Sequence, residues 1–259
     1  MSRVIAICNQ KGGVGKSTTA VNLGAYLALS GKQTLLIDLD PQGNATTACG
    51  IQRKDLQKDL YQVVIGKIQA TEAILPTAIE RLSIIPASLD LAGAEAYLAG
   101  ADSRETVLKR ICEPLRSSFD ILLFDCPPSL GSMTVNALAA ADSTIIPVQC
   151  EYLALEGLSS LMHAVTLIQQ NLNPSLRVGG IVLTMTDFRA NLAREVAEEV
   201  KGFFQDRVFQ TAIPRNIRLA ESPSFGKPIC LYDPHSAGAL AYRLLAEEVM
   251  QKEFVEQTS

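Results

Sequence analysis

The clearest chemistry in this sequence is concentrated in one short run, KGGVGKS, at residues 11–17. Its glycines let backbone N–H groups turn inward around phosphate oxygens, and a helix starting there adds the positive end of its dipole. Lys16 can reach the β- and γ-phosphates of a nucleotide, and the Ser17 hydroxyl can ligate Mg²⁺. The run therefore predicts a P-loop for ATP and Mg²⁺ rather than an ordinary glycine turn. The residues expected to contact ATP here are Lys11, Gly12, Gly13, Val14, Gly15, Lys16, Ser17 and Thr18.

A second lysine sets this loop apart from the general P-loop pattern. That pattern places a glycine at position 10, where this chain has Gln10, followed by Lys11. Two lysines of one chain cannot easily approach the same phosphates, because like charges repel each other at short range. We therefore expect Lys11 either to point outward and meet the nucleotide of a second subunit, or to be a solvent-exposed lysine without a partner.

Two aspartates close the apolar run at residues 34–38. Asp38 and Asp40 are two residues apart, so they share a face as long as the strand lasts. Ligand sites of open parallel sheets lie at the carboxyl ends of strands. One carboxylate could therefore help to hold the metal while the other orients water. A simple strand-end turn is the alternative, since Asp-Pro and Gly-Asn are turn formers.

Asp125 ends another apolar run, Ile121–Asp125, which has the form of a Walker B strand. We expect Asp125 to hold Mg²⁺ through water, although apolar strands that end in aspartate are common. The stiff loop CPPSLG at residues 126–131 would lie next to the γ-phosphate, where it could sense which nucleotide is bound.

Short apolar runs alternate with amphipathic stretches along the chain. Most runs are rich in Val, Ile and Leu without alternation, which is typical of strands covered on both faces. The pattern predicts an α/β fold, a doubly wound and mostly parallel sheet flanked by helices, in a single domain over residues 1–259 with an ordered core from about residue 3 to 250. The expected strands are Val4–Cys8, Thr34–Asp38, Leu82–Pro86, Ile121–Asp125, Thr144–Val148, Val178–Thr184 and Phe209–Ile213. The expected helices are Ser17–Ser30, capped by Gly31, then Asp55–Ile65, Asp90–Leu98, Ser103–Leu115, Gly131–Ala141, Leu155–Asn171, Asn191–Phe204 and Ser236–Phe254.

The composition is that of a folded globular protein, with 47% hydrophobic and 19% charged residues. No apolar run approaches the ~20 residues that a membrane span needs, so a cytoplasmic protein is expected. The net charge of −4 gives no general attraction to nucleic acid, and any DNA binding must come from a local basic patch. The six cysteines form no CxxC pair and are expected to be small buried hydrophobes.

Five segments together resemble one family. KGGVGKST, LLIDLDPQGNAT, FDCPPSLG, PVQCEYLALEGL and IPRNIRLAESPSFGKPICLYDPHS are similar to the ParA/Soj partition ATPases, which share a deviant Walker A loop with MinD. The resemblance extends from Val4 to about Val249. It implies an ATP-bound homodimer that binds double-stranded DNA non-specifically. It also implies hydrolysis stimulated by a ParB-type partner at centromere-like sites, and movement of a chromosome or plasmid in the nucleoid.

The resemblance also implies roles for individual residues. Lys11 matches the signature lysine that acts across the dimer, and Gly12 matches a glycine at the dimer contact. Asp40 matches the aspartate needed for hydrolysis, which makes Lys11, Lys16 and Asp40 the catalytic candidates. The implied metal ligands are Ser17, Asp38 and Asp125; the implied walls of the adenine site are Met185, Pro214 and Asn216; the arginines linked to DNA binding are Arg189 and Arg218, with Arg194 as an extra candidate.

Three other functions are alternatives to DNA partition. A MinD-like membrane ATPase would need a basic amphipathic C-terminal helix, whereas residues 246–259 hold four glutamates and one lysine, which an anionic surface would repel. An iron–sulfur carrier would need bridging cysteines. A nucleotide-gated scaffold that positions a protein cargo would use the same switch, and so stays an alternative. No helix-turn-helix for operator binding is expected ahead of the first strand.

Overall fold

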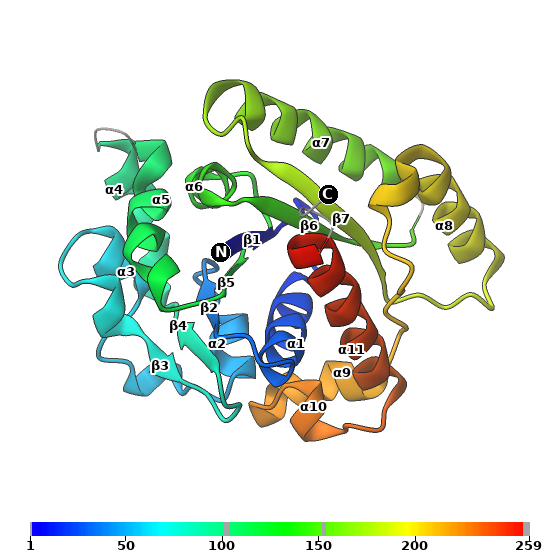
Figure 1. Cartoon of the computed structure of the whole chain (residues 1–259), viewed down its shortest axis with the longest axis horizontal. Coiled ribbons are helices and arrows are strands. Elements are labelled where there is room, and N and C mark those ends of the chain that lie inside the picture. The colour runs from blue at the N-terminus through cyan, green and yellow to red at the C-terminus, as the bar shows by residue number, and fades with distance from the viewer. Residues whose placement is uncertain (1, 101–103, 152–153, 256–259) are drawn as a thin grey trace.

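A computed structural model describes residues 2–100, 104–151 and 154–255 (Figure 1). Ser103 at the start of an expected helix, Tyr152 and Leu153 in a quoted motif, and residues 256–259 of the acidic tail lie outside these ranges. The described strands are β1 (Arg3–Ile7), β2 (Thr34–Asp38), β3 (Leu75–Pro76), β4 (Leu82–Ile85), β5 (Ile121–Asp125), β6 (Ser143–Gln149) and β7 (Arg177–Thr184). The described α-helices are α1 (Lys16–Leu29), α2 (Asn44–Ala48), α3 (Leu60–Val64), α4 (Ala94–Ala99), α5 (Val107–Cys112), α6 (Ser132–Ala140), α7 (Ala154–Asn171), α8 (Asn191–Phe204), α9 (Ile217–Glu221), α10 (Ile229–Tyr232) and α11 (Ala237–Met250).

The described strands form one seven-stranded sheet in the order β3-β4-β2-β5-β1-β6-β7. The short edge strand β3 is antiparallel to β4, and the other neighbours pair in parallel. The first strand of the chain therefore lies inside the sheet, and later strands are added on both sides of it. This confirms the doubly wound, mostly parallel α/β fold.

Helices cover both faces of the sheet (Figure 1). In β1, Val4 and Ala6 pack in an apolar core with residues of α3 to α8, whereas Ile5 and Ile7 pack in a second core with residues of α1, α2, α10 and α11. Side chains of a strand alternate between faces, so a strand buried on both faces is apolar throughout. The two cores explain why the sequence of these runs shows no alternation.

The expected strand Phe209–Ile213 is wrong in its secondary structure. The first and last residues of this segment donate their N–H groups to carbonyls of β7, at 2.9 and 2.8 Å. Between them, the N–H groups of Gln210 and Thr211 donate instead to the carboxylate of Glu248 in α11, each at 2.8 Å. A helix side chain thus takes the donors that a sheet ladder would use.

The expected helix Asp55–Ile65 is wrong in its first half. Asp59 caps α3 by accepting the N–H of Gln62 at 3.0 Å, so the helix begins at the residue after Asp59. Ahead of it lies a short 3-10 turn, Arg53–Asp55. The expected helix Asp90–Leu98 likewise begins as a 3-10 turn before α4.

Smaller expectations have clear outcomes. Gly31 has a φ of +91° just beyond the end of α1, which confirms its capping position. Five of the six cysteines are buried and Cys230 is half-buried, as expected of small hydrophobes. The edge strand β3 and the short helices α2, α9 and α10 were not predicted, because elements this short leave little periodicity in a sequence.

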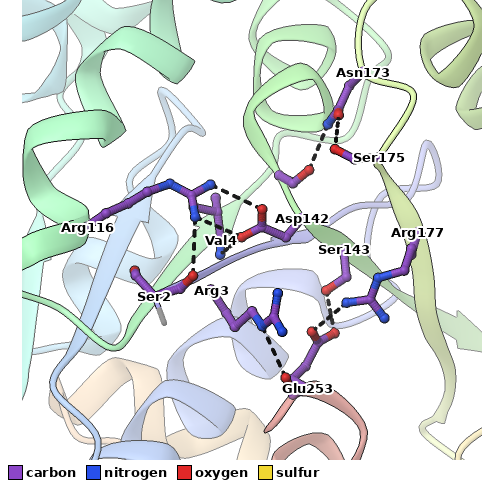
Figure 2. A network of polar contacts seen from close by, with 11 residues as sticks. Ser2, Arg3, Val4, Arg116, Asp142, Ser143, Asn173, Ser175, Arg177 and Glu253 are labelled. Carbon is purple, nitrogen blue, oxygen red and sulfur yellow. Dashed lines mark hydrogen bonds and ion pairs between the residues drawn. The ribbon is translucent and has the colours of Figure 1, made fainter. Parts of the chain in front are cut away.

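Glu253 fastens the C-terminal segment to the edge of the sheet at which the strands begin. Figure 2 shows its carboxylate accepting hydrogen bonds from Ser143 Oγ at 2.5 Å and from Arg177 Nη2 at 3.0 Å, while its backbone carbonyl accepts one from Arg3 Nε at 3.1 Å. These three partners are the first residues of β6, β7 and β1. The Glu253 side chain is only 3% exposed, so its buried carboxylate ties β6 and β7 to the C-terminal segment, and its backbone carbonyl adds β1.

We predict that Glu253→Ala lowers the free energy of unfolding by about 1–3 kcal/mol, because the buried Ser143 hydroxyl loses its acceptor. Glu253→Gln keeps an acceptor oxygen and should lose less. Urea denaturation followed by circular dichroism measures both. The control is Glu247→Ala, which removes an exposed glutamate paired with Arg243 in α11 and should change little. Equal denaturation midpoints for Glu253→Ala and Glu247→Ala would contradict the prediction.

Candidate nucleotide-binding site

The carboxyl ends of β1, β5 and β2 bring the predicted site residues together. These strands are neighbours, and Asp125 at the end of β5 stands in register with Ile7 of β1 on one side and with Asp38 of β2 on the other. The glycine loop starts just beyond Ile7. The parallel register therefore gathers the loop and both aspartate segments at one edge of the sheet.

The glycine loop wraps around the start of α1. Gly13 and Gly15 have φ values of +76° and +88°, in the left-handed region that glycine adopts at little cost. The Val14 carbonyl accepts a hydrogen bond from Thr184 Oγ1 at 2.8 Å, which fixes the loop against the end of β7. Because Gly15 is the N-cap of α1, no capping side chain covers the first N–H groups of the helix. The loop has the form that binds phosphate.

Lys16 is held inside this loop. Its ammonium group donates to the Lys11 carbonyl at 3.0 Å, and the residue is only 7% exposed. Burial lowers the pKa of Lys16, and this is opposed by nearby acids, first among them Asp125 and then, less strongly, Cys126 and Asp40. Lys16 is thus folded back over the loop, near these acids.

Asp125 is buried at this edge without satisfied oxygens. It is 0% exposed, and neither carboxylate oxygen has a hydrogen-bond partner among the described residues. The Ser17 hydroxyl is near enough to favour the charged form, yet no hydrogen bond of ordinary geometry joins the two. Burial, and after it the charge of Asp38, raise the pKa of Asp125. A buried orphan carboxylate beside a hydroxyl suits a divalent cation, since Mg²⁺ takes one or two carboxylates and completes its shell with phosphates and water.

Asp38 differs from Asp125 because both of its oxygens are used. One accepts the N–H and the hydroxyl of Thr46, at 2.8 and 2.7 Å, and the other accepts the N–H of Asp40 at 3.2 Å. Burial raises the pKa of Asp38 and these hydrogen bonds oppose the rise. Asp38 thus fastens the start of the following turn, and its predicted place in the metal shell stays a prediction.

Asp40 lies at the rim of the site. It is 7% exposed, and its Oδ1 accepts the N–H of Gln42 at 2.9 Å. Its backbone carbonyl accepts the N–H of Gly43 at 2.8 Å, which closes a tight turn. The carboxylate borders the main cavity, where it can act on a bound molecule.

Two adjoining cavities follow the loop. The larger, about 640 Å³, is lined by Gly12, Gly13, Gly15, Lys16, Ser17, Thr18, Asp40 and further residues of α2, Arg53 and the 222–228 segment. The smaller, about 200 Å³ and mainly apolar, is lined by Met185, Pro214 and Asn216 together with Thr18 and Tyr242. The structure therefore brings together the three residues expected around an adenine base. Met185 borders both cavities with a φ of +51°, an uncommon conformation for a side chain of this size.

Lys11 points away from its own loop. Its ammonium group forms an ion pair with Glu151 beyond β6 at 2.5 Å, and both side chains are nearly half exposed. It does not line either cavity. The structure thus shows Lys11 directed outward and paired with Glu151 of its own chain. Contact with a second subunit stays a prediction.

The segments that carry Arg189 and Arg218 lie side by side. Thr186 pairs with Pro214 in a parallel bridge, three residues before Arg189 and four before Arg218. Both arginines are exposed, at 91% and 56% of their side chains, and both make local ion pairs. Arg189 binds Asp187 through two nitrogens, at 2.8 and 2.7 Å, and its hydrogen bonds lower the pKa of Asp187 to about 2.

Sequence reasoning missed several residues at this edge. Arg53 and Lys227 line the larger cavity. The exposed Arg215 directly follows Pro214 in one of the paired segments and contributes to the lowered pKa of Asp187. Gln42 and Asn44, in the turn after Asp40, could have been included from their position alone. Arg53 carries no local signal. Arg194, the extra candidate, is exposed and donates to Asn191 in its own helix.

Known proteins match this chain along most of its length. The family described as an AAA domain matches residues 2–178. The sporulation initiation inhibitor protein Soj of Bacillus subtilis is 54% identical over 96% of this chain and 98% of Soj. The chromosome partitioning protein ParA of Myxococcus xanthus is 50% identical over 98% of this chain and 89% of its own. This chain belongs to the ParA/Soj family.

A solved structure agrees with the fold of this ParA/Soj family member. The cobyrinic acid a,c-diamide synthase of Mycobacterium smegmatis, with a bound ATP analog and magnesium, superposes with a TM-score of 0.85 at 37% identity. The match covers 97% of this chain and 95% of the other. Over the residues that the structure describes, no helix is long and apolar enough to cross a membrane. Within the same ranges, no three His, Cys, Asp or Glu side chains are grouped as ligands of a metal.

We predict that Asp125→Asn raises the melting temperature of the nucleotide-free protein by a few degrees, because it removes a buried charge that lacks partners. The same change should abolish the Mg²⁺-dependent part of ATP binding. Differential scanning fluorimetry and titration calorimetry, with and without Mg²⁺, measure the two effects. Asp38→Asn is the matched control: its amide nitrogen would face the donors of Thr46, so it should lower the melting temperature. A lowered melting temperature for Asp125→Asn as well would contradict the analysis.

Proposed function

We propose that this ParA/Soj family member is an ATP-dependent dimerising ATPase that binds DNA without sequence preference. With a ParB-type partner it drives the partition of a chromosome or plasmid, acting in the cytoplasm on the nucleoid. The observation that carries the catalytic part is the orphan carboxylate of Asp125 beneath Lys16 and Ser17. The partition role is supported by the relatives that share half or more of the sequence.

The residues divide the chemistry among themselves. Ser17 and Asp125 hold Mg²⁺, and Lys16 neutralises the β- and γ-phosphates together with the N–H groups of the loop. Bound Mg²⁺ draws charge from the phosphate oxygens as the γ-phosphoryl group is transferred. Asp40 orients the attacking water from the rim of the cavity, and Asp38 holds the start of the Asp40 turn.

The base of ATP takes the smaller cavity. Met185, Pro214 and Asn216 offer an apolar slot next to the start of α1, and the size of about 200 Å³ suits a purine ring. The triphosphate then runs from this slot along Thr18 into the loop. The two adjoining cavities thus correspond to the two ends of one nucleotide.

The proposed dimerisation is supported by the outward direction of Lys11. Its ammonium group is half exposed and bound to a surface carboxylate, so a more densely charged anion can take it over. The triphosphate of a second subunit is such an anion. Gly12 borders the larger cavity, and its lack of a side chain leaves room for that approach.

DNA binding draws on Arg189 and Arg218, which closely follow the paired residues Thr186 and Pro214. Each arginine is balanced by a nearby acid, so one patch attracts phosphate weakly. A dimer presents two patches, and linking two weak contacts raises affinity steeply. ATP can therefore gate DNA binding through association alone.

Rival functions have less support. A MinD-like role at a membrane conflicts with a C-terminal segment whose glutamates are engaged within the chain, Glu248 with residues 210–211 and Glu253 with Arg177. The cobyrinic acid a,c-diamide synthase shares 37% identity, against 54% and 50% for Soj and ParA. A scaffold that moves a protein cargo would show the same nucleotide site and would differ only in lacking DNA binding.

We predict that Asp40→Ala dimerises with MgATP but hydrolyses it on the order of 100-fold more slowly, because water is no longer oriented.

Lys11→Ala should bind ATP and remain a monomer, and Lys16→Ala should lose nucleotide binding. Light scattering measures association and phosphate release measures turnover. A normal single-turnover rate for Asp40→Ala would remove its role, and a wild-type chain that stays monomeric at saturating ATP with hydrolysis blocked would refute the dimer.

We predict that Arg189→Ala and Arg218→Ala weaken binding of the ATP-bound protein to any duplex about equally and spare dimerisation. Each should reduce the slope of log affinity against log salt by about 1, as expected for a lost phosphate contact. Fluorescence anisotropy on two unrelated duplexes, with ATP and with ADP across a salt series, measures this. Arg243→Ala, an exposed arginine of α11 with its own glutamate partner, is the matched control. Undiminished binding by the double variant, or strong preference for one duplex, would count against the patch.

A further inference from the structure

Arg53 reaches from its 3-10 turn to the turn that carries Asp40. Its Nη2 donates to the Pro41 carbonyl at 3.0 Å and its Nη1 donates to the Gln42 carbonyl at 2.5 Å. Both acceptors directly follow Asp40 in the chain. The planar guanidinium group therefore grips two successive carbonyls of this turn.

The inner side of the same turn is held by different groups. The N–H of Asp40 donates to Asp38, the N–H of Gln42 donates to the Asp40 carboxylate, and the N–H of Gly43 donates to the Asp40 carbonyl. These bonds use the N–H groups and leave the carbonyls of Pro41 and Gln42 facing outward. Arg53 supplies the donors on that outer side, so the turn is held from both directions.

The contact between Arg53 and the turn is close. Gly43 has a φ of +62°, and a Cβ atom built on it would lie 2.8 Å from Arg53 Nε and 2.9 Å from its Cδ. Nε itself is buried without a hydrogen-bond partner among the described residues. An unsatisfied buried donor costs stability, and here it accompanies a side chain packed flat against the bare backbone of the turn.

Arg53 also borders the proposed catalytic site. It lines the 640 Å³ cavity together with Asp40 and Gln42, whereas its neighbour Lys54 does not. We propose that Arg53 is a positioning residue for hydrolysis, which fixes the Asp40 carboxylate relative to the phosphate loop by clamping the two carbonyls after it. The inference rests on the proposed function, in which Asp40 orients the attacking water.

The clamp depends on the shape of arginine as well as on its charge. A guanidinium group presents parallel donors in a rigid plane, whereas a lysine ammonium is a point charge on a flexible stem. Lysine at position 53 could therefore bond one carbonyl but not hold both. A displacement of about 1 Å in a catalytic group can cost up to about 100-fold in rate.

The test compares steady-state hydrolysis of MgATP by full-length wild type, Arg53→Ala, Arg53→Lys and the control Lys54→Ala under identical conditions. We expect kcat to fall on the order of tenfold for Arg53→Ala, with KM within about twofold of wild type, and to fall by an intermediate amount for Arg53→Lys. Lys54→Ala, which removes an adjacent exposed cation, should behave as wild type. A rise in KM with unchanged kcat would overturn the proposal, since Arg53 would then bind nucleotide. Full activity of Arg53→Lys would overturn it as well, because charge alone would suffice.

A double-mutant cycle with Asp40 separates positioning from a general loss of structure. If Arg53 acts through Asp40, adding Arg53→Ala to Asp40→Ala should not slow hydrolysis further. Multiplicative losses would overturn the proposal. Normal hydrolysis by Asp40→Ala would refute the catalytic part of the proposed function itself. Loss of activity in Asp40→Ala with full activity in Arg53→Ala would refute the inference about Arg53 alone.

Discussion

The site depends on the register of β5 between β1 and β2. Asp125 stands level with Ile7 on one side and Asp38 on the other, so the loop after β1 closes directly over both carboxylates. A slip of one residue would turn Asp125 to the opposite face of the sheet and put Cys126 in its place. The apolar side chains that fill both cores hold this register, because any slip would exchange the two faces of every strand. Packing far from the cavity thus determines which side chains lie at its base.

The charges at this edge are unbalanced without a ligand. Asp38, Asp40 and Asp125 are all largely buried, and Lys16 is the cation held among them. Buried charges that lack partners cost free energy. That cost is limited at Asp38, because both of its oxygens accept hydrogen bonds, and at Asp40, which borders the larger cavity. Asp125 is the one of the three whose buried oxygens have no hydrogen-bond partner among the described residues. The site therefore suits a cation and an anion together rather than either alone, which is the charge pattern of a metal–nucleotide complex.

Local patterns in the sequence were sufficient for every described strand except the short β3, most long helices, the phosphate loop and the two aspartate segments. Their signals lie within a few residues, as in the apolar run that ends at Asp125. The missing parts depend on contacts between distant segments. Glu248 accepts the N–H groups of residues 210–211, which a strand would have used. Glu151 pairs with Lys11 across 140 residues. Arg53 bonds to the turn after Asp40, and no local pattern around Arg53 predicts that contact. Hydrogen bonds of this kind follow from the assembled fold, so no window of sequence contains them.

The position of β1 has a consequence for the growing polypeptide. β1 is synthesised well before its neighbours in the sheet, because β5 and β6 begin only at Ile121 and Ser143. At typical rates of synthesis, this interior strand waits on the order of ten seconds for its first partner. The bond from Arg3 to the Glu253 carbonyl spans 250 residues, so this contact at the base of the sheet can form only after Glu253 has been synthesised. An apolar strand left unpaired for so long is a natural target for chaperones, and a truncated chain would keep it exposed.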